Sequence, residues 1–398
     1  MWIKREISDK IRSNTDSVQI LRGPRQCGKS SLILNLDPEF KEVSLDDMAL
    51  RHLAQNDPEM LLKPYEDQKV FIDEAQYAPL LFPAIKQRVD KLRRAPSFKR
   101  HTFFRISGSN QILMDRNVKE SLAGRASFFE MNTLSISEIL SARDLPIQKL
   151  LFLGGWPEIH AHNLKEKEAK KYMDDYISSY VEKDVVLTAG IQKSSEFLKF
   201  LRLLAGRVGN ILDLAGLARE VGVDSKTIKE WTHALEGMNI IRLVQPYSTN
   251  LSKRLVKSPK IYFIDLGLAC RLQGWSESEP LLTSPNYGQL FENLVFSEIY
   301  KLKLNTDFEC KIFYWRSRDG EEIDFLLEFN PQVYLFIEAK ASRTGKARDI
   351  GKFPEVRKVF KNKIPPFVVC VQEGTQILGN QIPVRLLSEY LKKTWLKV

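Results

Sequence analysis

Short apolar runs separated by helical patterns characterise the first 135 residues of the chain. Four runs predict buried strands: 18–22 (VQILR), 69–73 (KVFID), 102–107 (TFFRIS) and 126–131 (ASFFEM). A helical pattern, SSLILNL, follows the loop after the first run. This alternation predicts an α/β domain with a parallel sheet over residues 1–135.

The pattern changes along the rest of the chain. Residues 136–205 are helical in pattern, with EKEAKKYMDDYISSYVEKDVV as the longest amphipathic stretch. Residues 206–275 predict two short helices joined around 221–224, then strands at 240–247 and 259–265. Residues 280–398 predict the order helix (287–303), strands (311–316, 322–329, 333–340), helix (349–360) and strand (367–371).

The loop after the first strand fits the phosphate-binding pattern G-x-x-x-x-G-K-[ST]. The matching residues are Gly23, Pro24, Arg25, Gln26, Cys27, Gly28, Lys29 and Ser30, and Ser31 follows them in the helix. Backbone N–H groups of such a loop face the β-phosphate, and the helix N-terminus adds a favourable field. We expect Lys29 to reach the β- and γ-phosphates and the Ser30 hydroxyl to bind Mg²⁺.

Two carboxylates end the second apolar strand. We expect Asp73 to hold Mg²⁺, directly or through water, and Glu74 to orient and deprotonate the attacking water. The alternative is that this acid pair caps the next helix.

Two further polar residues are candidates for the same site. Asn110, after the third strand, is placed to touch the γ-phosphate or its water; alternatively it serves a turn. Arg125 is a candidate arginine finger for the nucleotide of a neighbouring subunit in a homo-oligomer; a surface salt bridge is the alternative.

Together with the sequence phrases that follow, these motifs resemble those of a widespread prokaryotic family of AAA-type ATPases that carry a C-terminal DUF4143 domain. The resemblance rests on RGPRQCGKSSL, VSLDDMALRHLAQNDPEMLL, VFIDEAQ, ISGSNQ and LAGRASFFEMNTLSISEI, and on the later phrases GGWPEIH, YVEKDV, SPKIYFIDLGLA and GQLFENLVFSEI. It covers nearly the whole chain. It implies an ATP-binding α/β domain, a winged helix and a nuclease-like C-terminal fold, and residues 136–205 suit the helical lid that follows an AAA core.

Charge favours a polyanion as partner of the rear half. The net charge is +10, and residues 190–260 hold 12 basic and 6 acidic residues. The second helix of the helix-turn-helix would present Lys226 and Lys229, and the link between the two strands carries Lys253, Arg254 and Lys257 without an acid. These lysines and arginine predict contacts to nucleic acid, with DNA favoured. Winged helices also dock proteins, so a protein partner remains the alternative.

The C-terminal order of elements matches the PD-(D/E)xK, restriction-endonuclease-like fold, with Asp324 as first acid and Glu338-Ala339-Lys340 as E-x-K. Asn330 and Pro331 predict a turn, and a hairpin centred on Pro331 places Asp324 opposite Glu338. Like charges so placed destabilise a sheet unless a cation joins them, and carboxylates suit Mg²⁺ or Mn²⁺.

We therefore expect a metal site with Lys340 on the same face as Glu338, placed to position the attacking water, and with Glu292 from the preceding helix completing the metal shell. The alternatives are a register slip by one residue, or acids that are exposed and solvated.

The cysteines, the histidines and the lengths of the apolar runs indicate which classes of protein the sequence does not fit. Four cysteines show no metal or disulfide spacing, and His160 and His162 have no carboxylate at metal spacing. No secretory signal or membrane-length apolar run is present, which predicts a cytoplasmic protein that does not enter a membrane. The sequence thus predicts an ATP- and Mg²⁺-dependent ATPase coupled to a metal-dependent nuclease-like domain. The alternative is an ATP-switched DNA- or protein-binding regulator that does not cleave.

Overall fold

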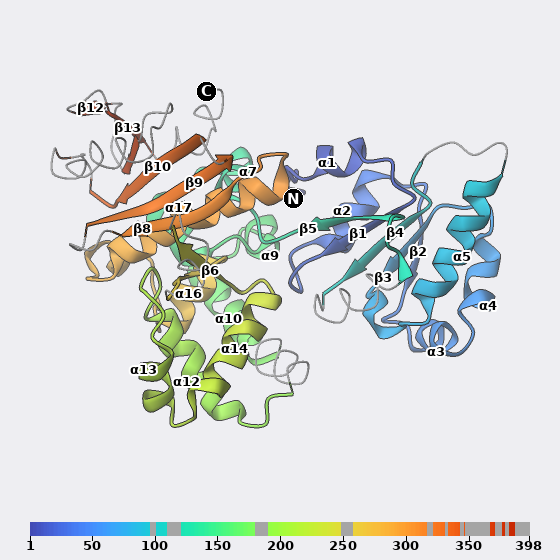
Figure 1. Ribbon diagram of the computed structural model, residues 1–398, viewed down its shortest axis with the longest axis horizontal. Coiled ribbons are helices and arrows are strands. Elements are labelled where there is room, and N and C mark those ends of the chain that lie inside the picture. The colour runs from blue at the N-terminus through green and yellow to red at the C-terminus, as the bar shows by residue number, and fades with distance from the viewer. Residues whose placement is uncertain are drawn as a thin grey trace.

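Two β-sheets lie toward opposite ends of the long axis of the computed structural model (Figure 1). The structure describes residues 1–95, 101–109, 121–179, 190–247, 258–316, 321–330, 333–342 and 346, together with the backbone of three later strands. The N-terminal sheet has five strands and the other has eight.

The N-terminal sheet is parallel throughout, with the order β2-β3-β4-β1-β5. Its strands are β1 (Val18–Arg22), β2 (Lys41–Ser44), β3 (Val70–Asp73), β4 (Phe104–Gly108) and β5 (Ala126–Glu130). Its helices are α1 (Ser8–Ser13), α2 (Lys29–Leu36), α3 (Met48–Asn56), α4 (Pro58–Leu62) and α5 (Leu81–Arg94). The α/β prediction for this region is confirmed.

Alternation along β1 explains why this sheet is covered on both faces. Val18 and Ile20 belong to one apolar core, which also contains residues of α4 and α5. Leu21 belongs to a second core, with Ile7 and Leu32 from the α1 and α2 side. Successive side chains of a strand point to opposite faces, so one apolar run supplies both cores.

Connector helices and the helix-turn-helix follow. They are α7 (Ile136–Ala142), α8 (Ile147–Leu153), α9 (Pro157–Ala161), α10 (Glu166–Tyr176), α12 (Ser194–Ala205), α13 (Leu214–Val221) and α14 (Ser225–Gly237). Gly222 takes the left-handed conformation, φ +90°, at the turn after α13, and Asp224 caps α14 by accepting the N–H of Thr227 at 2.8 Å. The left-handed glycine ends the first of the two predicted helices, and the aspartate cap begins the second.

The second sheet has the order β12-β13-β11-β10-β9-β8-β6-β7. Its elements, with two associated helices, are β6 (Ile241–Pro246), β7 (Lys260–Phe263), α16 (Leu266–Leu272), α17 (Tyr287–Asn305), β8 (Lys311–Arg316), β9 (Glu322–Asn330), β10 (Val333–Lys340), β11 (Phe367–Cys370), β12 (Gln376–Leu378) and β13 (Ile382–Leu386). The predicted helix at 349–360 lies outside the described residues.

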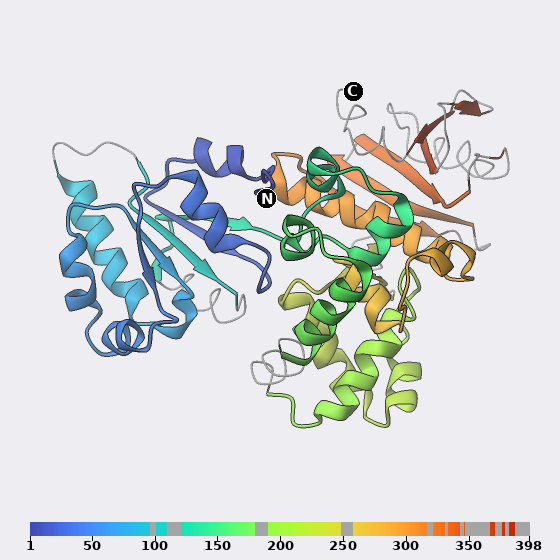
Figure 2. The ribbon, with the colours of Figure 1, turned by 180° about the vertical axis from the view of Figure 1, so that it is seen from behind.

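One core and one sheet run across the boundaries expected at 205 and 275–280. Strand β6, expected in the wing, pairs in parallel with β8. A single apolar cluster extends from Leu134 through the connector and α14 to Ala339. Seen from behind, the green helices of the connector lie beside the orange α17 (Figure 2). The rear parts of the chain are therefore packed together rather than separated by linkers.

A close crossing of two chain segments holds this assembly together. Gly154, which ends α8, has φ +64° and ψ −153°, a conformation that is essentially restricted to glycine. A Cβ there would lie 2.2 Å from Asp265 Oδ1, and that carboxylate also accepts the N–H of Gly155 at 2.8 Å and caps α16. The crossing thus requires glycine at position 154, because of the backbone conformation there and because no Cβ fits against Asp265.

Gly154→Ala is expected to destabilise the chain by about 3 kcal/mol or more, because backbone strain adds to the clash with Asp265. Gly274→Ala is the matched control, since Gly274 has φ +92° but nothing within 4 Å of a Cβ, and it should cost only about 1 kcal/mol. Thermal unfolding of the two variants measures the difference. Equal melting temperatures would contradict this account.

Candidate functional site

The phosphate-binding loop lies between β1 and α2. Gly28 has φ +92° and Gln26 has φ +60°, so the loop curls twice through the left-handed region. Lys29 is buried, and its Nζ donates to the carbonyl oxygens of Gly23 at 3.0 Å and Pro24 at 2.8 Å. Its ammonium is thereby held over the loop, where a phosphate would be bound.

The carboxyl ends of three parallel strands bring the magnesium candidates together. Ser30 Oγ donates to Asp73 Oδ2 at 2.7 Å, and Ser107, at the end of β4, donates its hydroxyl to the other oxygen of Asp73. Asp73 is only 8% exposed. A hydroxyl and a carboxylate side by side are the oxygen donors that Mg²⁺ prefers, so these residues fit the expected ion. Sequence reasoning missed Ser107, although it ends a predicted strand.

Glu74 adopts a left-handed conformation, φ +54°, which places its carboxylate apart from that of Asp73. Gln76 and Ser109 both donate to Glu74 Oε2, Ser109 at 2.8 Å. Burial raises the pKa of Glu74, but the charge of Lys29 and these two hydrogen bonds outweigh it, so the pKa lies below its ordinary value. Glu74 is therefore ionised at neutral pH, as a general base must be.

Arg25, Gln26 and Arg125, which were also predicted for this site, form hydrogen bonds with other side chains of the protein. Arg25 Nη2 donates to the hydroxyl of Tyr77 at 3.0 Å, and Gln26 Oε1 accepts the hydroxyl of Tyr172 at 2.7 Å. Arg125 makes two hydrogen bonds to the Asp90 carboxylate, at 2.6 and 3.0 Å. It would have to leave this pair to act as an arginine finger, a role that stays a prediction. Asn110 lies outside the described residues.

A cavity of about 210 Å³ adjoins the loop. Gly28 and Ser31 line it on one side, and Trp2, Leu134 and Pro157 are among its apolar walls. The cavity therefore lies between the N-terminal segment, the phosphate-binding loop and the start of α9.

The C-terminal hairpin has the register expected from its turn. Tyr334 pairs with Glu328, and each following pair up to Ile337 with Phe325 keeps the same register. One step further along this register brings Glu338 opposite Asp324, and Asp324 Oδ2 accepts the N–H of Ala339 at 2.9 Å. The two acids are 2% and 7% exposed, so they are buried rather than solvated.

Two lysine side chains form ion pairs with acids of this region. Lys340 Nζ lies 2.6 Å from Glu338 Oε1. Lys260, on β7, forms ion pairs with Glu322 and with Glu292, the latter at 2.9 Å. No group of three acids, cysteines or histidines within the described ranges has the geometry to hold a metal ion. The expected convergence of Glu292, Asp324 and Glu338 around one metal is therefore not seen in this part of the chain.

Glu292 belongs to a buried polar cluster instead. Its Oε1 also accepts the hydroxyl of Tyr262 at 2.5 Å. Burial and the charge of Asp324 raise the pKa of Glu292 to about 7, although Lys260 and Tyr262 oppose the rise. Sequence reasoning missed Lys260; a lysine within the apolar run PKIYFID was the available signal, because a buried lysine requires acidic partners.

Family models match three successive parts of the chain. Residues 15–140 match a family described as AAA domain, and residues 287–387 match the domain of unknown function DUF4143. The chain is an AAA-domain protein with a C-terminal DUF4143 domain. Residues 145–279, between them, match the domain of unknown function DUF8612. The parallel sheet and its loop belong to an AAA-type P-loop ATPase domain.

Relatives occur in bacteria and archaea. An uncharacterized protein of Mycobacterium tuberculosis is 29% identical over 328 residues, 82% of this chain and 71% of the relative. One of Methanocaldococcus jannaschii is 24% identical over 392 residues, with coverages of 90% and 82%. A Walker-type ATPase of Pyrococcus abyssi is a structural neighbour with 15% identity, coverages of 67% and 95%, and a TM-score of 0.41. The ORC2 protein of Aeropyrum pernix has 12% identity, coverages of 60% and 84%, and a TM-score of 0.28.

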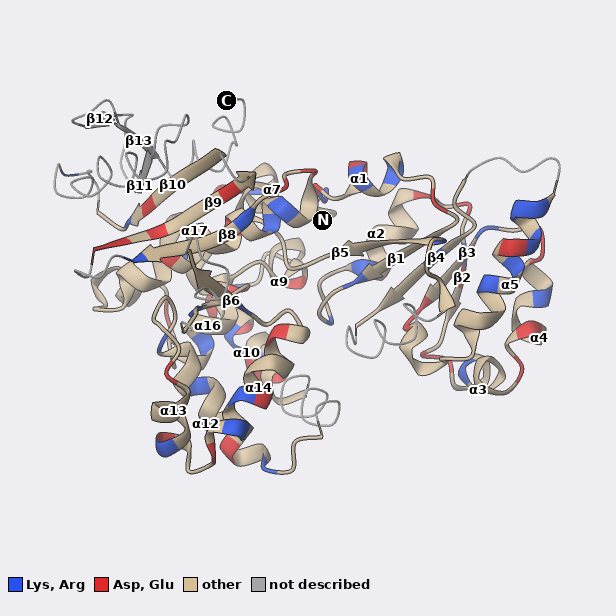
Figure 3. Ribbon diagram, in the orientation of Figure 1, with Lys and Arg blue, Asp and Glu red and all other residues tan. Residues whose placement is uncertain are grey.

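The structure describes two of the five basic residues that were predicted to contact nucleic acid. Lys226 and Lys229 are exposed on α14, and Lys226 lies 4.0 Å from Glu230. Charges of both signs are interspersed over α12 to α14 (Figure 3). Lys253, Arg254 and Lys257 lie outside the described residues. Within the residues that the structure describes, no helix is long and apolar enough to cross a bilayer.

The two histidines of the HAH stretch have different surroundings. His160 is buried, with Nε2 at 2.8 Å from the carbonyl oxygen of Gly154, and burial lowers its pKa to about 4. His162 is exposed beside Glu158. Neither belongs to a metal-binding group among the described residues.

Titration of Glu292 should affect stability. Its folded-state pKa of about 7 exceeds the ordinary 4.5, so the folded state binds this proton more tightly than the unfolded state. The resulting stabilisation is complete below about pH 4.5 and is lost as the pH rises through 7. The charged groups facing Glu292 are Lys260, Asp324 and Glu322.

Calorimetric unfolding of wild type and Glu292→Gln between about pH 5 and 8 tests this. The stability of wild type relative to the variant should fall with rising pH. Glu309→Gln, which removes an exposed carboxylate near the same sheet, is the control. A difference that does not change with pH would contradict the shift.

Proposed function

We propose that the chain hydrolyses ATP with Mg²⁺ and uses the nucleotide cycle to control the binding of nucleic acid by its rear half. The observation that carries the ATPase part is the contact of 2.7 Å between Ser30 Oγ and Asp73 Oδ2, at the end of the loop that holds Lys29. Ser30 and Asp73 would hold Mg²⁺, which neutralises charge on the phosphates when bound. Lys29 would exchange its two carbonyl partners for phosphate oxygens.

Glu74 is the proposed general base. Its carboxylate is ionised, partly buried and held by Ser109 and Gln76, so it is placed to orient a water and take its proton. The cavity beside Gly28 and Ser31 is the proposed site for the nucleobase, because it adjoins the phosphate loop and has apolar walls that suit an aromatic ring.

Glu74→Gln should retain Mg–ATP binding and lower kcat by about 100-fold or more, because a general base typically contributes that much. Lys29→Ala should lose binding instead. Calorimetric titration and phosphate release measure the two effects. Glu66→Gln, an exposed carboxylate of the same domain that pairs with Lys91, should leave both unchanged. Hydrolysis at the wild-type rate by Glu74→Gln would refute the assignment.

Binding without cleavage is the function that the C-terminal geometry supports best. Lys260 pairs with the partly buried Glu292 and Lys340 with the buried Glu338, so these two acids already have a cation of the chain itself as partner. The exposed lysines of α14 are the proposed contacts to DNA phosphates. A protein partner on the same helix is the alternative.

Cleavage by the DUF4143 domain is the second candidate, favoured by the register that sets Asp324 opposite Glu338. In that case Mg²⁺ or Mn²⁺ would bind these acids, and Lys340 would leave Glu338 to position a water. The chain should then cut DNA or RNA in a metal-dependent manner.

Full-length protein incubated with DNA or RNA, Mn²⁺ or Mg²⁺, and ATP distinguishes the two candidates. Cleavage that is lost in Lys340→Gln but retained in Lys311→Gln, an exposed lysine of β8 in the same sheet, would establish the nuclease. If wild type leaves every substrate intact yet retains DNA in an ATP-dependent manner, the binding function holds. Neither cleavage nor ATP-dependent retention would refute both.

A further inference from the structure

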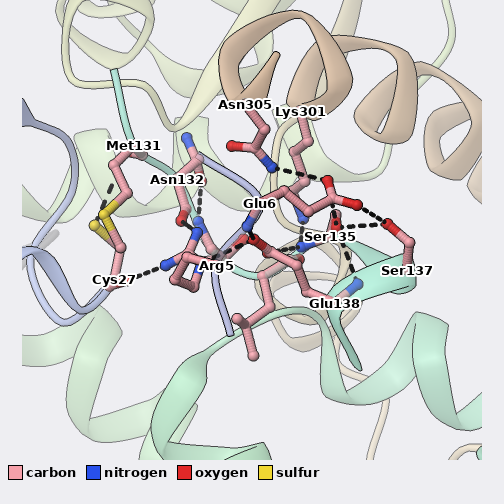
Figure 4. A network of polar contacts seen from close by, with 12 residues as sticks. Arg5, Glu6, Cys27, Met131, Asn132, Ser135, Ser137, Glu138, Lys301 and Asn305 are labelled. Carbon is pink, nitrogen blue, oxygen red and sulfur yellow. Dashed lines mark hydrogen bonds and ion pairs between the residues drawn. The ribbon is translucent and has the colours of Figure 1, made fainter. Parts of the chain in front are cut away.

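A buried arginine from the N-terminal segment bonds the phosphate-binding loop and is one of the residues that line the cavity beside Gly28 and Ser31. Arg5 is 3% exposed. Its Nη1 donates to the carbonyl oxygen of Cys27 at 2.8 Å, Nη2 donates to that of Asn132 at 2.7 Å, and Nε donates to Glu138 Oε1 at 3.1 Å. Figure 4 shows these three partners arranged around one guanidinium. Arg5 therefore joins the loop, the segment after β5 and α7.

The contact with Cys27 fixes the orientation of a peptide unit in the loop. In a planar trans peptide the C=O and the following N–H point in opposite directions. Because the carbonyl of Cys27 is directed at Arg5, the N–H of Gly28 points away from Arg5. The loop also lies tightly against its support, since a Cβ on Gly23 would come within 2.0 Å of the Met131 carbonyl oxygen.

The same network reaches the C-terminal domain through α7. Glu138, beside Arg5, accepts the backbone N–H of Glu6 at 2.6 Å and that of Ser135 at 2.8 Å. The Glu6 carboxylate accepts the Ser137 hydroxyl at 2.7 Å and the Asn305 amide at 3.4 Å. Asn305 is the last residue of α17, so the chain of contacts crosses from the ATPase domain to the DUF4143 domain.

Two further contacts attach α17 to the start of α7. Lys301 Nζ donates to the carbonyl oxygen of Leu134 at 2.8 Å, and Glu298 Oε2 accepts the N–H of Ile136 at 2.9 Å. Both of these α17 side chains are buried, which strengthens their electrostatic interactions. The same helix carries Glu292, which contacts Lys260 in the C-terminal site.

We propose that Arg5 is a positioning residue that sets the peptide between Cys27 and Gly28 for phosphate binding and couples the nucleotide loop to α17. A nucleotide that displaces the loop would also displace Arg5. Through Arg5 the displacement would reach Glu138 and the first turn of α7, and from there α17. This proposal rests on ATP binding at the loop, and its tests separate the two.

Arg5→Lys tests the positioning role. A lysine ammonium keeps the charge but lacks the planar fork through which Arg5 bonds Cys27, Asn132 and Glu138 from three separate nitrogens. The variant should fold, and its Kd and KM for Mg–ATP should rise about tenfold, with a smaller change in kcat. Arg271→Lys is the control, because Arg271 also bonds a carboxylate, that of Asp174, and a backbone carbonyl, that of Trp275, and neither partner belongs to the loop.

Three outcomes of this experiment are informative. An unchanged Kd in folded Arg5→Lys would overturn the positioning role. An equal loss in both arginine variants would show that general destabilisation explains the effect and would also overturn it. If wild type itself does not bind Mg–ATP, the proposed ATPase function fails instead.

Hydrogen exchange of the α17 amides with and without Mg–ADP tests the coupling. Nucleotide should change exchange over residues 293–305 by about tenfold in wild type, and Arg5→Lys and Lys301→Met should lose most of that response. Lys303→Met is the control, since Lys303 lies on the same helix but donates to Cys310, not to α7. Identical exchange with and without nucleotide in wild type, while Mg–ADP is bound, would refute the coupling.

Discussion

The buried pair of Arg5 and Glu138 is the interaction on which the arrangement of the two halves depends. Both side chains are almost fully withdrawn from water, at 3% and 0% exposed, so each charge would be costly alone. Further hydrogen bonds surround the pair, to carbonyls on the arginine side and to backbone N–H groups on the glutamate side. Such a pair tolerates little displacement, because breaking it leaves an uncompensated buried charge. It therefore fixes where the ATPase domain meets the rest of the chain.

Internal cations are a common feature of both candidate sites. In the ATPase site Lys29 is held by loop carbonyls, and in the C-terminal site Lys260 is held by Glu292 and Glu322. Each ammonium satisfies groups that would otherwise be buried without compensation. The partners of the two ammonium groups differ in charge. Lys29 is surrounded by neutral acceptors, which a phosphate readily replaces, whereas Lys260 is bound by full charges.

The continuous rear core provides a physical route for mechanical coupling along this chain. One cluster of apolar side chains includes the connector helices, α14, α17 and the hairpin of β9 and β10. Packed cores transmit displacements because they deform little, and α17 touches both the α7 contacts and the buried acids. Strand β6 pairs with β8, so one sheet continues from residues 145–279 into residues 287–387.

Features that depend on local pattern could be predicted from the amino-acid sequence. The loop from Gly23 to Ser30, strand β1 and the hairpin register near Asp324 followed from spacing and turn residues, since these are set by neighbours in the chain. Sequence reasoning missed edge strand β2, whose four residues include only one buried apolar side chain, Val43, too weak a signal to separate from a loop.

The long-range partners, in contrast, depend on how the chain packs in three dimensions. The tertiary structure paired Arg125 with Asp90, Glu292 with Lys260, and Arg5 with a loop and a helix 22 and 133 residues away. Any arginine can pair with any accessible acid or carbonyl, so the sequence offers many equivalent choices. The packing of the two halves, which buries these charges and leaves each only a few reachable partners, makes the choice.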